Sequence, residues 1–320
     1  MRIVVLDGRT MNPGDNPWTL LKPLGHLEVY EQSNAEQAQE RSKGADILIT
    51  NKVEIGEALL EALPSLQYIT VTATGVNVVD LDATSKRNIP VSNVPEYGSR
   101  TVAQFVFAQL LRLCHQVADH DTAVRQGRWE QSGDFSFWES PQMELVDKTM
   151  GLIGFGKIGQ EVGKLANAFG MNVLATSGRR RPEVKYAPFE YVEMDELLQR
   201  ADVVSLHCPL TDANAEMVNE SFLKRMKTSG FLINTARGGL VSEADLAAGL
   251  NADWIAGAAL DVVSQEPILE SNPLLNAKNC LLTPHMAWAT LESRQRLMKT
   301  TAENIAAFIS GRPQNLVNNP

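Results

Sequence analysis

The segment Gly154-Phe155-Gly156-Lys157-Ile158-Gly159 follows a short apolar run and opens an amphipathic stretch. A Gly-x-Gly-x-x-Gly spacing between a strand and a helix is the fingerprint of dinucleotide binding. The first glycine permits a tight turn, the second lets the backbone approach a pyrophosphate, and the third allows close packing of helix and strand. Amide groups at the helix start then hold the phosphates. The alternative is an ordinary glycine-rich turn. We expect a dinucleotide to bind at Gly154, Gly156, Lys157, Ile158 and Gly159.

The end of the next expected strand bears on the choice of dinucleotide. NAD enzymes normally carry Asp or Glu there, which accepts hydrogen bonds from the ribose hydroxyls. Here the chain reads Ser177-Gly178-Arg179-Arg180. A hydroxyl, a glycine and two arginines suit a ribose 2′-phosphate better than a bare ribose. These residues predict NADPH in preference to NADH, the alternative being that the arginines form a solvated turn.

Three further residues have side chains that could take part in catalysis, and each follows an expected strand: Arg237, Glu266 and His285. The carboxyl ends of parallel strands meet at one edge of the sheet, where ligands bind in open α/β folds. A lone histidine in such a place is more often structural than catalytic. Its combination with an arginine and a glutamate, beside a dinucleotide fingerprint, favours catalysis.

Hydride transfer between a nicotinamide and a 2-keto acid requires these residue types. A cation must hold the carboxylate and polarise the carbonyl, and the planar fork of Arg237 suits that task. An acid must protonate the developing alkoxide, and His285 is the candidate. A carboxylate at Glu266 would favour the charged imidazolium and keep its proton available near neutral pH.

The elements that position these residues are strands and helices in alternation, which is typical of βαβ units and parallel sheets. In the first array we expect strands at residues 3–6, 27–30, 47–50, 68–72 and 90–92, and helices at 35–42 and 57–63. In the second we expect strands at residues 149–153, 172–175, 203–207, 230–234, 255–260 and 280–283, and a helix at 156–169. One long helix is expected over residues 100–128, an irregular aromatic segment over 129–141, and a final helix over 291–309, free to pack on the first domain.

The composition is that of a two-domain globular protein, with 320 residues, 44% of them hydrophobic and 21% charged. A net charge of −9 disfavours nucleic acid and anionic lipid as partners. No apolar run reaches the roughly 18 residues of a membrane span, and the start of the chain lacks signal-peptide features. The cysteines Cys114, Cys208 and Cys280 are far apart, so we expect neither disulfides nor a metal site, and a cytoplasmic location.

Over essentially its whole length the chain resembles the D-isomer-specific 2-hydroxyacid dehydrogenases. The motifs that carry the resemblance are Gly154–Gly159, His207-Cys208-Pro209-Leu210-Thr211, Asn234–Gly239, Asp261–Pro267 and Thr283–Trp288. Within this family the sequence is most similar to glycerate dehydrogenases (hydroxypyruvate reductases). They share segments like Leu6–Gly8, Asn12–Asp15, Ala73–Asp80 and Phe135–Trp138.

The resemblance implies an α/β fold with two doubly wound parallel-sheet domains. A Rossmann NAD(P)-binding domain, residues 100–288 with a dimerisation helix and loop, would be inserted in a flavodoxin-like substrate-binding domain, residues 1–99 and 289–320. It also implies that Arg237 binds substrate, that Glu266 is the partner carboxylate, and that His285 is the acid/base.

The resemblance assigns further roles position by position. Substrate would meet Asn51, Lys52, Thr74 and Gly75 in addition to Arg237 and His285. The cofactor would meet Val102, His207, Cys208, Pro209, Thr235, Ala236 and Asp261, the last through the nicotinamide amide. The departure from many NAD-using members is Ser177 in place of Asp.

The activity implied is reduction of hydroxypyruvate or glyoxylate to D-glycerate or glycolate by NAD(P)H in a homodimer. The helix at 101–126 and the aromatic loop at 129–138 would join the subunits, with Trp138 reaching the neighbour's cleft. The alternatives are a dinucleotide-sensing protein of the corepressor type and a broader 2-keto acid reductase. A degraded catalytic set would favour the corepressor, but Arg237, Glu266 and His285 are all present. A closer enzymatic alternative is a formate dehydrogenase, whose counterpart of Glu266 is a neutral glutamine, so Glu266 argues against it.

Overall fold

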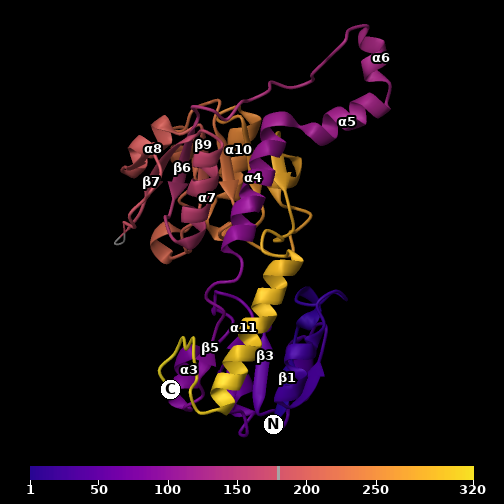
Figure 1. Cartoon of the computed structure of the whole chain (residues 1–320), viewed down its shortest axis with the longest axis vertical. Helices are drawn as coiled ribbons and strands as arrows, with labels where there is room; N and C mark the ends of the chain where they lie inside the picture. The colour runs from indigo at the N-terminus through magenta and orange to yellow at the C-terminus, as the bar shows by residue number, and fades with distance from the viewer. Residues whose placement is uncertain (179–180) are drawn as a thin grey trace. The chain divides into compact units, whose positions relative to one another are not determined.

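The computed structural model describes residues 1–178 and 181–320 and divides into two compact units (Figure 1). The first unit consists of Met1–Gly98 and Trp288–Pro320, and the second consists of Ser99–Ala287. The chain therefore leaves the first unit once and returns to it once.

The first unit contains a five-stranded parallel sheet in the order β2-β1-β3-β4-β5. Its strands are β1 (Arg2–Val5), β2 (His26–Val29), β3 (Ile47–Thr50), β4 (Tyr68–Val71) and β5 (Val91–Ser92). Its helices are α1 (Ala35–Ser42), α2 (Glu57–Glu61), α3 (Leu81–Lys86) and α11 (Leu291–Ile309). The strand order is flavodoxin-like and reverses between β1 and β3, which makes the crevice beyond their carboxyl ends a topological switch point.

Both faces of this sheet are covered, so its central strands are buried along their whole length. All four residues of β3 and all four of β4 are buried. The final helix α11, yellow in Figure 1, packs on the sheet of the first unit. Its Phe308 ring stacks on Tyr68 with the ring centroids 4.4 Å apart, and Leu297 is fully buried in the same core.

The second unit contains a seven-stranded parallel sheet in the order β12-β11-β10-β9-β6-β7-β8. Its strands are β6 (Thr149–Ile153), β7 (Asn172–Thr176), β8 (Phe189–Tyr191), β9 (Val203–Leu206), β10 (Phe231–Asn234), β11 (Gly257–Leu260) and β12 (Cys280–Leu282). Its helices are α4 (Ser99–His115), α5 (Val117–Arg125), α6 (Arg128–Ser132), α7 (Lys157–Ala168), α8 (Met194–Arg200), α9 (Glu220–Leu223) and α10 (Glu243–Asn251). This is the Rossmann order with an added strand, and its switch point lies between β6 and β9. The predicted fold class is confirmed.

The described residues also form short 3₁₀ helices at Gly8–Thr10, Trp18–Leu20, Lys22–Leu24, Asp212–Asn214, Gly238–Leu240 and Pro273–Asn276. Across the described ranges, no helix combines the length and apolar character needed to cross a bilayer.

The prediction of one long helix over residues 100–128 is wrong. Gln116 adopts φ 44°, a left-handed conformation that an α-helix of L-residues does not tolerate, so α4 and α5 are separate. Gly127 at φ 83° makes the next break, after which residues expected to be irregular form α6. Strand β8 was also missed, because its three residues are too short to show a periodic pattern.

Candidate active site

The glycine fingerprint forms a cradle at the carboxyl end of β6. Gly154 has φ 94°, and a Cβ there would lie 2.7 Å from the amide nitrogen of Cys208. A Cβ on Gly159 would lie 2.4 Å from the carbonyl oxygen of Gly154. At Gly156 an added Cβ would meet no described atom within 4 Å. The outer two glycines are therefore required for packing, and the middle one leaves the backbone open to approach.

The start of α7 is the second part of the cradle. Gly156 is its N-cap residue and has no side chain, so it makes no side-chain hydrogen bond to the first-turn amides of this 12-residue helix. Lys157 and Ile158 are the first two helical residues. The switch-point position and these amides fit the pyrophosphate of a dinucleotide.

The turn after β7 is described only in part. Ser177 is half-buried, and Gly178 is exposed with open space where a Cβ would stand. The predicted Arg179 and Arg180 lie outside the described residues. The guanidinium of Arg181 lies 5.4 Å from the centroid of the Tyr191 ring. The NADPH preference thus stays a prediction.

His207 and Cys208 follow β9 and form the wall against Gly154. The His207 Nε2 atom lies 2.9 Å from the hydroxyl of Ser205. Removal of the imidazole from water lowers the pKa of His207 to about 3, and burial raises the pKa of Cys208. Both side chains are therefore neutral near pH 7, and neither is suited to acid/base catalysis.

The other residues predicted to meet the cofactor also belong to the second unit. Val102 lies in α4 and is 7% exposed, whereas Pro209 is exposed after β9. Thr235 and Ala236 follow β10 and are half-buried. The Thr235 hydroxyl oxygen is buried and has no hydrogen-bond partner among the described residues. An unpaired buried hydroxyl at this edge is available to a bound ligand.

The loop that carries Arg237 is held by Asn234, the last residue of β10. Asn234 is fully buried; its side-chain amide donates to the carbonyl of Arg237 at 2.9 Å, and its Oδ1 accepts from the amide of Ala236 at 3.0 Å. A Cβ on Gly238 would overlap the carbonyl carbon of Val263 at 1.9 Å. The Arg237 side chain itself is exposed. Sequence reasoning assigned Asn234 no role, although its place at the strand end was visible.

His285 and Glu266 form the predicted pair. The Nδ1 atom of His285 lies 2.7 Å from Oε2 of Glu266, and each side chain is about one third exposed. His285 has φ 53°, and its amide donates to the carbonyl of Asp261 at 2.8 Å. Because Nδ1 faces the carboxylate, Nε2 is the ring nitrogen that can exchange a proton with a substrate.

The carboxylate of Asp261 holds the segment around His285. It is 1% exposed and accepts from the Thr283 hydroxyl at 2.6 Å and from the amides of Met286 and Ala287 at 2.9 and 2.8 Å. Gln109 of α4 donates in turn to Thr283 at 3.2 Å. In the structure Asp261 thus bonds to its own chain, and its role toward the nicotinamide amide stays a prediction.

The residues predicted to bind substrate through the first unit lie at the carboxyl edge of that unit's sheet. Asn51 and Lys52 follow β3, and the Asn51 side chain donates to the carbonyl of Thr72 at 2.6 Å. Thr74 donates to the carbonyl of Val94 at 3.0 Å, and Gly75 follows it. Lys52 and Thr74 are exposed, and Gly75 is half-buried.

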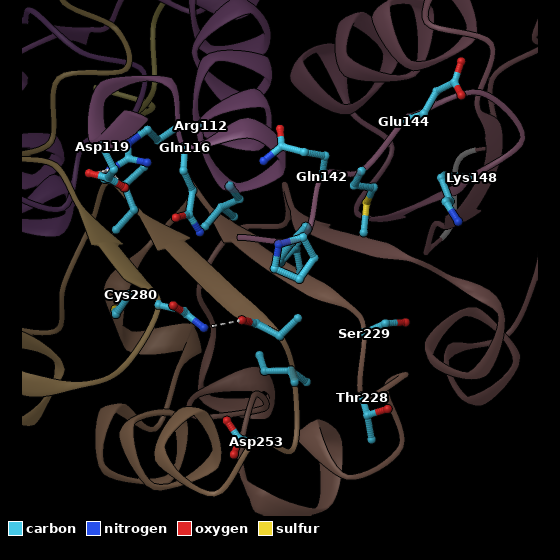
Figure 2. Close-up of a pocket in the computed structure, with 18 of the residues that line it drawn as sticks. Arg112, Gln116, Asp119, Gln142, Glu144, Lys148, Thr228, Ser229, Asp253 and Cys280 are labelled. Carbon is cyan, nitrogen blue, oxygen red and sulfur yellow. Dashed lines mark hydrogen bonds and ion pairs between the residues drawn. The ribbon is translucent and has the colours of Figure 1, made fainter. Parts of the chain in front are cut away.

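A cavity of about 830 Å³ opens at the opposite edge of the second sheet (Figure 2). Phe231 and Cys280, the first residues of β10 and β12, line it together with Arg112 of α4 and Gln116, which directly follows α4. It contains none of the predicted site residues and is separate from the cradle. Over residues 1–178 and 181–320 no group of His, Cys, Asp and Glu could hold a metal ion.

A Rossmann sheet with a dinucleotide cradle, an exposed arginine and a carboxylate–histidine pair along one edge is the arrangement of a dinucleotide-dependent dehydrogenase. Residues 107–287 match the profile of the D-isomer specific 2-hydroxyacid dehydrogenase NAD-binding domain. The chain belongs to this family.

Relatives of similar length support the assignment. A hydroxypyruvate reductase of Blautia hydrogenotrophica is 45% identical over 321 residues, covering 99% of this chain and 100% of the relative. A glycerate dehydrogenase of Methylorubrum extorquens is 39% identical over 318 residues, covering 99% and 98%. The structure of an NADPH-dependent glyoxylate/hydroxypyruvate reductase from Sinorhizobium meliloti superposes with a TM-score of 0.85 at 26% identity, covering 99% and 98%.

The contact between Glu266 and His285 predicts a loss of proton transfer when it is removed. Glu266→Gln replaces the carboxylate that lies 2.7 Å from Nδ1 of His285, so the ring loses the partner that directs Nε2 away from Glu266. We expect kcat for keto acid reduction to fall by about tenfold or more, measured as initial rates at saturating substrate. Glu270→Gln, an exposed change in the same segment, is the control. A kcat for Glu266→Gln equal to that of wild type would contradict the pairing.

Proposed function

We propose that the chain reduces hydroxypyruvate or glyoxylate with NAD(P)H, giving D-glycerate or glycolate. The observation that carries the proposal is the 2.7 Å contact between Glu266 and His285 on the same sheet edge as the Gly154 cradle. Relatives named hydroxypyruvate reductase, glycerate dehydrogenase and glyoxylate reductase support this substrate class.

In the proposed reaction each side chain has a separate task. Arg237 binds the carboxylate and polarises the keto oxygen, which stabilises charge as it develops. Bound NAD(P)H, held at the glycine cradle and the start of α7, would supply the hydride to the keto carbon. His285 donates the Nε2 proton to the keto oxygen, and Glu266 stabilises the imidazolium before transfer. In the oxidative direction His285 accepts the same proton.

The first unit has a candidate carboxylate-binding segment of its own. The backbone amides of Thr74, Gly75 and Val76 donate no hydrogen bond within the described residues. Successive unpaired amides form a concave anion-binding surface. Thr74 is fixed by its hydroxyl bond to Val94 and by Asn93, whose side chain donates to the Thr74 carbonyl at 2.7 Å. We assign substrate carboxylate binding to this segment, which follows β4. The exposed Lys52 follows the neighbouring strand β3 at the same carboxyl edge of the sheet.

Two variants test the roles of the charged groups. His285→Ala should lower kcat by about 100-fold or more, because the proton donor is lost. Arg237→Ala should lower kcat and raise KM together, because its cation contacts substrate in both ground and transition states. Initial rates with a panel of 2-keto acids, followed by the absorbance of the reduced nicotinamide, provide the measurement.

Near-wild-type turnover in His285→Ala would contradict the mechanism. The same panel identifies the substrate: equal kcat/KM for bulky and small keto acids would point to a broader 2-keto acid reductase. Dinucleotide binding without turnover of any 2-keto acid would favour the corepressor type.

The cofactor proposal is a preference for NADPH, with NADH usable. Ser177 offers a neutral hydroxyl instead of a carboxylate that would repel a 2′-phosphate, and Gly178 leaves open space beside it. Charge-assisted bonds from Arg179 or Arg180 would give roughly a 10- to 100-fold preference. The Sinorhizobium meliloti neighbour is named as NADPH-dependent.

Kinetics with both cofactors test this preference. The double variant Ser177→Asp, Arg179→Ala should lower kcat/KM for NADPH and reverse the preference toward NADH, because it adds a repelling charge and removes an attracting one. A wild type that favours NADH by about tenfold would overturn the interpretation of this turn.

We further propose a cytoplasmic homodimer joined through the region from α5 to the aromatic loop. Large apolar side chains are exposed there: Val117 is 67%, Phe135 is 87% and Trp138 is 68% exposed. Apolar surface of this kind marks a protein interface. Trp138 is the candidate for reaching the partner's substrate cleft.

Light scattering tests the homodimer. At micromolar concentration we expect twice the mass of one chain, and Phe135→Ser should shift the equilibrium toward monomer, because it removes an exposed aromatic anchor. Wild-type protein that is monomeric and fully active would contradict the proposal.

A further inference from the structure

We propose that Asp7 is a positioning residue for substrate binding: it fixes the segment Asn51–Val53 and, through Asn51, the end of β4. The inference rests on the proposed function, because that function assigns the substrate carboxylate to this edge of the first unit. Asp7 itself would not touch substrate. It would set the positions of the groups that do.

Asp7 occupies the topological switch point of the first sheet. It follows β1, which lies beside β3 in the sheet. The carboxyl ends of these two strands bound the crevice from which their crossover connections diverge. A side chain at this point can therefore reach the loop after β3 without help from another element.

The carboxylate of Asp7 accepts hydrogen bonds from three consecutive backbone amides. Its Oδ2 accepts from Asn51 at 3.1 Å, from Lys52 at 2.5 Å and from Val53 at 3.1 Å, and its Oδ1 accepts from Asn51 at 2.8 Å. Three amides that converge on one anion define the conformation of the loop that carries them. The loop after β3 is thus shaped around an internal carboxylate.

Asn51 passes this constraint to the next strand. Its side-chain amide donates to the carbonyl of Thr72 at 2.6 Å and lies 3.2 Å from the Thr72 hydroxyl. Thr72 is 3% exposed and lies two positions before Thr74, the first residue of the Thr74–Val76 segment that the proposed function assigns to the substrate carboxylate. Asp7, Asn51 and Thr72 join the carboxyl ends of β1, β3 and β4.

A carboxylate suits this position better than an amide would. All of the partners of Asp7 are N–H donors, and both of its oxygens accept. An asparagine would turn one acceptor into an NH₂ group that faces a backbone N–H. Burial raises the pKa of Asp7, while the three amides and the charge of Lys52 act in the opposite direction. The hydrogen bonds from these amides compensate the carboxyl group for its partial removal from water.

The experiment compares Asp7→Asn with Asp46→Asn. Asp46 lies just before β3 in the same sheet, at the opposite edge, and also accepts a backbone amide, that of Arg2 at 2.7 Å. Asp7→Asn should raise KM for the keto acid about five- to thirtyfold with kcat nearly unchanged. It should also weaken calorimetric binding of oxalate, an unreactive carboxylate, and leave the Kd of NADPH unchanged. Asp46→Asn should lower Tm without moving KM or oxalate affinity.

Hydrogen exchange supplies a readout that needs no turnover. In Asp7→Asn the amides of Asn51, Lys52 and Val53 should exchange faster, whereas those of β3 should not. If Asp7→Asn does not fold, Asn51→Ser keeps the three backbone amides that Asp7 accepts from and removes the side-chain amide that donates to Thr72. It should raise KM by a smaller factor. A folded Asp7→Asn enzyme with wild-type KM and oxalate affinity would overturn the inference alone, whereas a wild type that turns over no 2-keto acid would overturn the proposed function.

Discussion

The carboxyl edge of the second unit's sheet depends on one buried group, the carboxylate of Asp261. At 1% exposure this group must be compensated by hydrogen bonds, and the chain supplies a hydroxyl and two amides. The same residue links two neighbouring strands through its backbone: its amide donates to Asn234, and its carbonyl accepts from His285. The left-handed backbone of His285 is tolerated because these bonds determine it. Arg237, Glu266 and His285 are thereby presented from three strand ends that one residue ties together.

The first unit uses the same device at its own switch point. Asp7 follows β1 and orders the loop after β3, just as Asp261 follows β11 and orders the loop after β12. Asp261 lies one position past its strand and Asp7 two positions past its own. Each carboxylate accepts hydrogen bonds from backbone amides in the loop that follows the neighbouring strand. Parallel sheets leave these loops without strand partners, so a carboxylate that accepts several backbone amides is an efficient way to fix them. Each unit therefore carries a shaped edge independently of the other.

Sequence reasoning was strongest where the signal was local. Residues 35–42, 47–50, 149–153 and 291–309 have the predicted secondary structure and bounds, since periodicity and apolar runs are contiguous in the chain. It failed at Gln116, because nothing in that residue's type announces a left-handed backbone, and at β8, whose three residues carry no period. It assigned no role to Asn234 or Asp7, because their partners depend on loop conformations that sequence spacing does not specify.

By itself the sequence determined the family, the dinucleotide fingerprint and the residue types of the site, because those depend on identities at fixed spacings. The tertiary structure decided which groups meet: it brought the His285 ring to 2.7 Å from Glu266, 19 positions away. It also decided that the Asp261 carboxylate accepts hydrogen bonds from its own chain and that burial keeps His207 neutral. Contacts, burial and the pKa values that follow from them arise only when distant segments exclude water from the same place. That is a property of packing, and no single segment of the chain contains it.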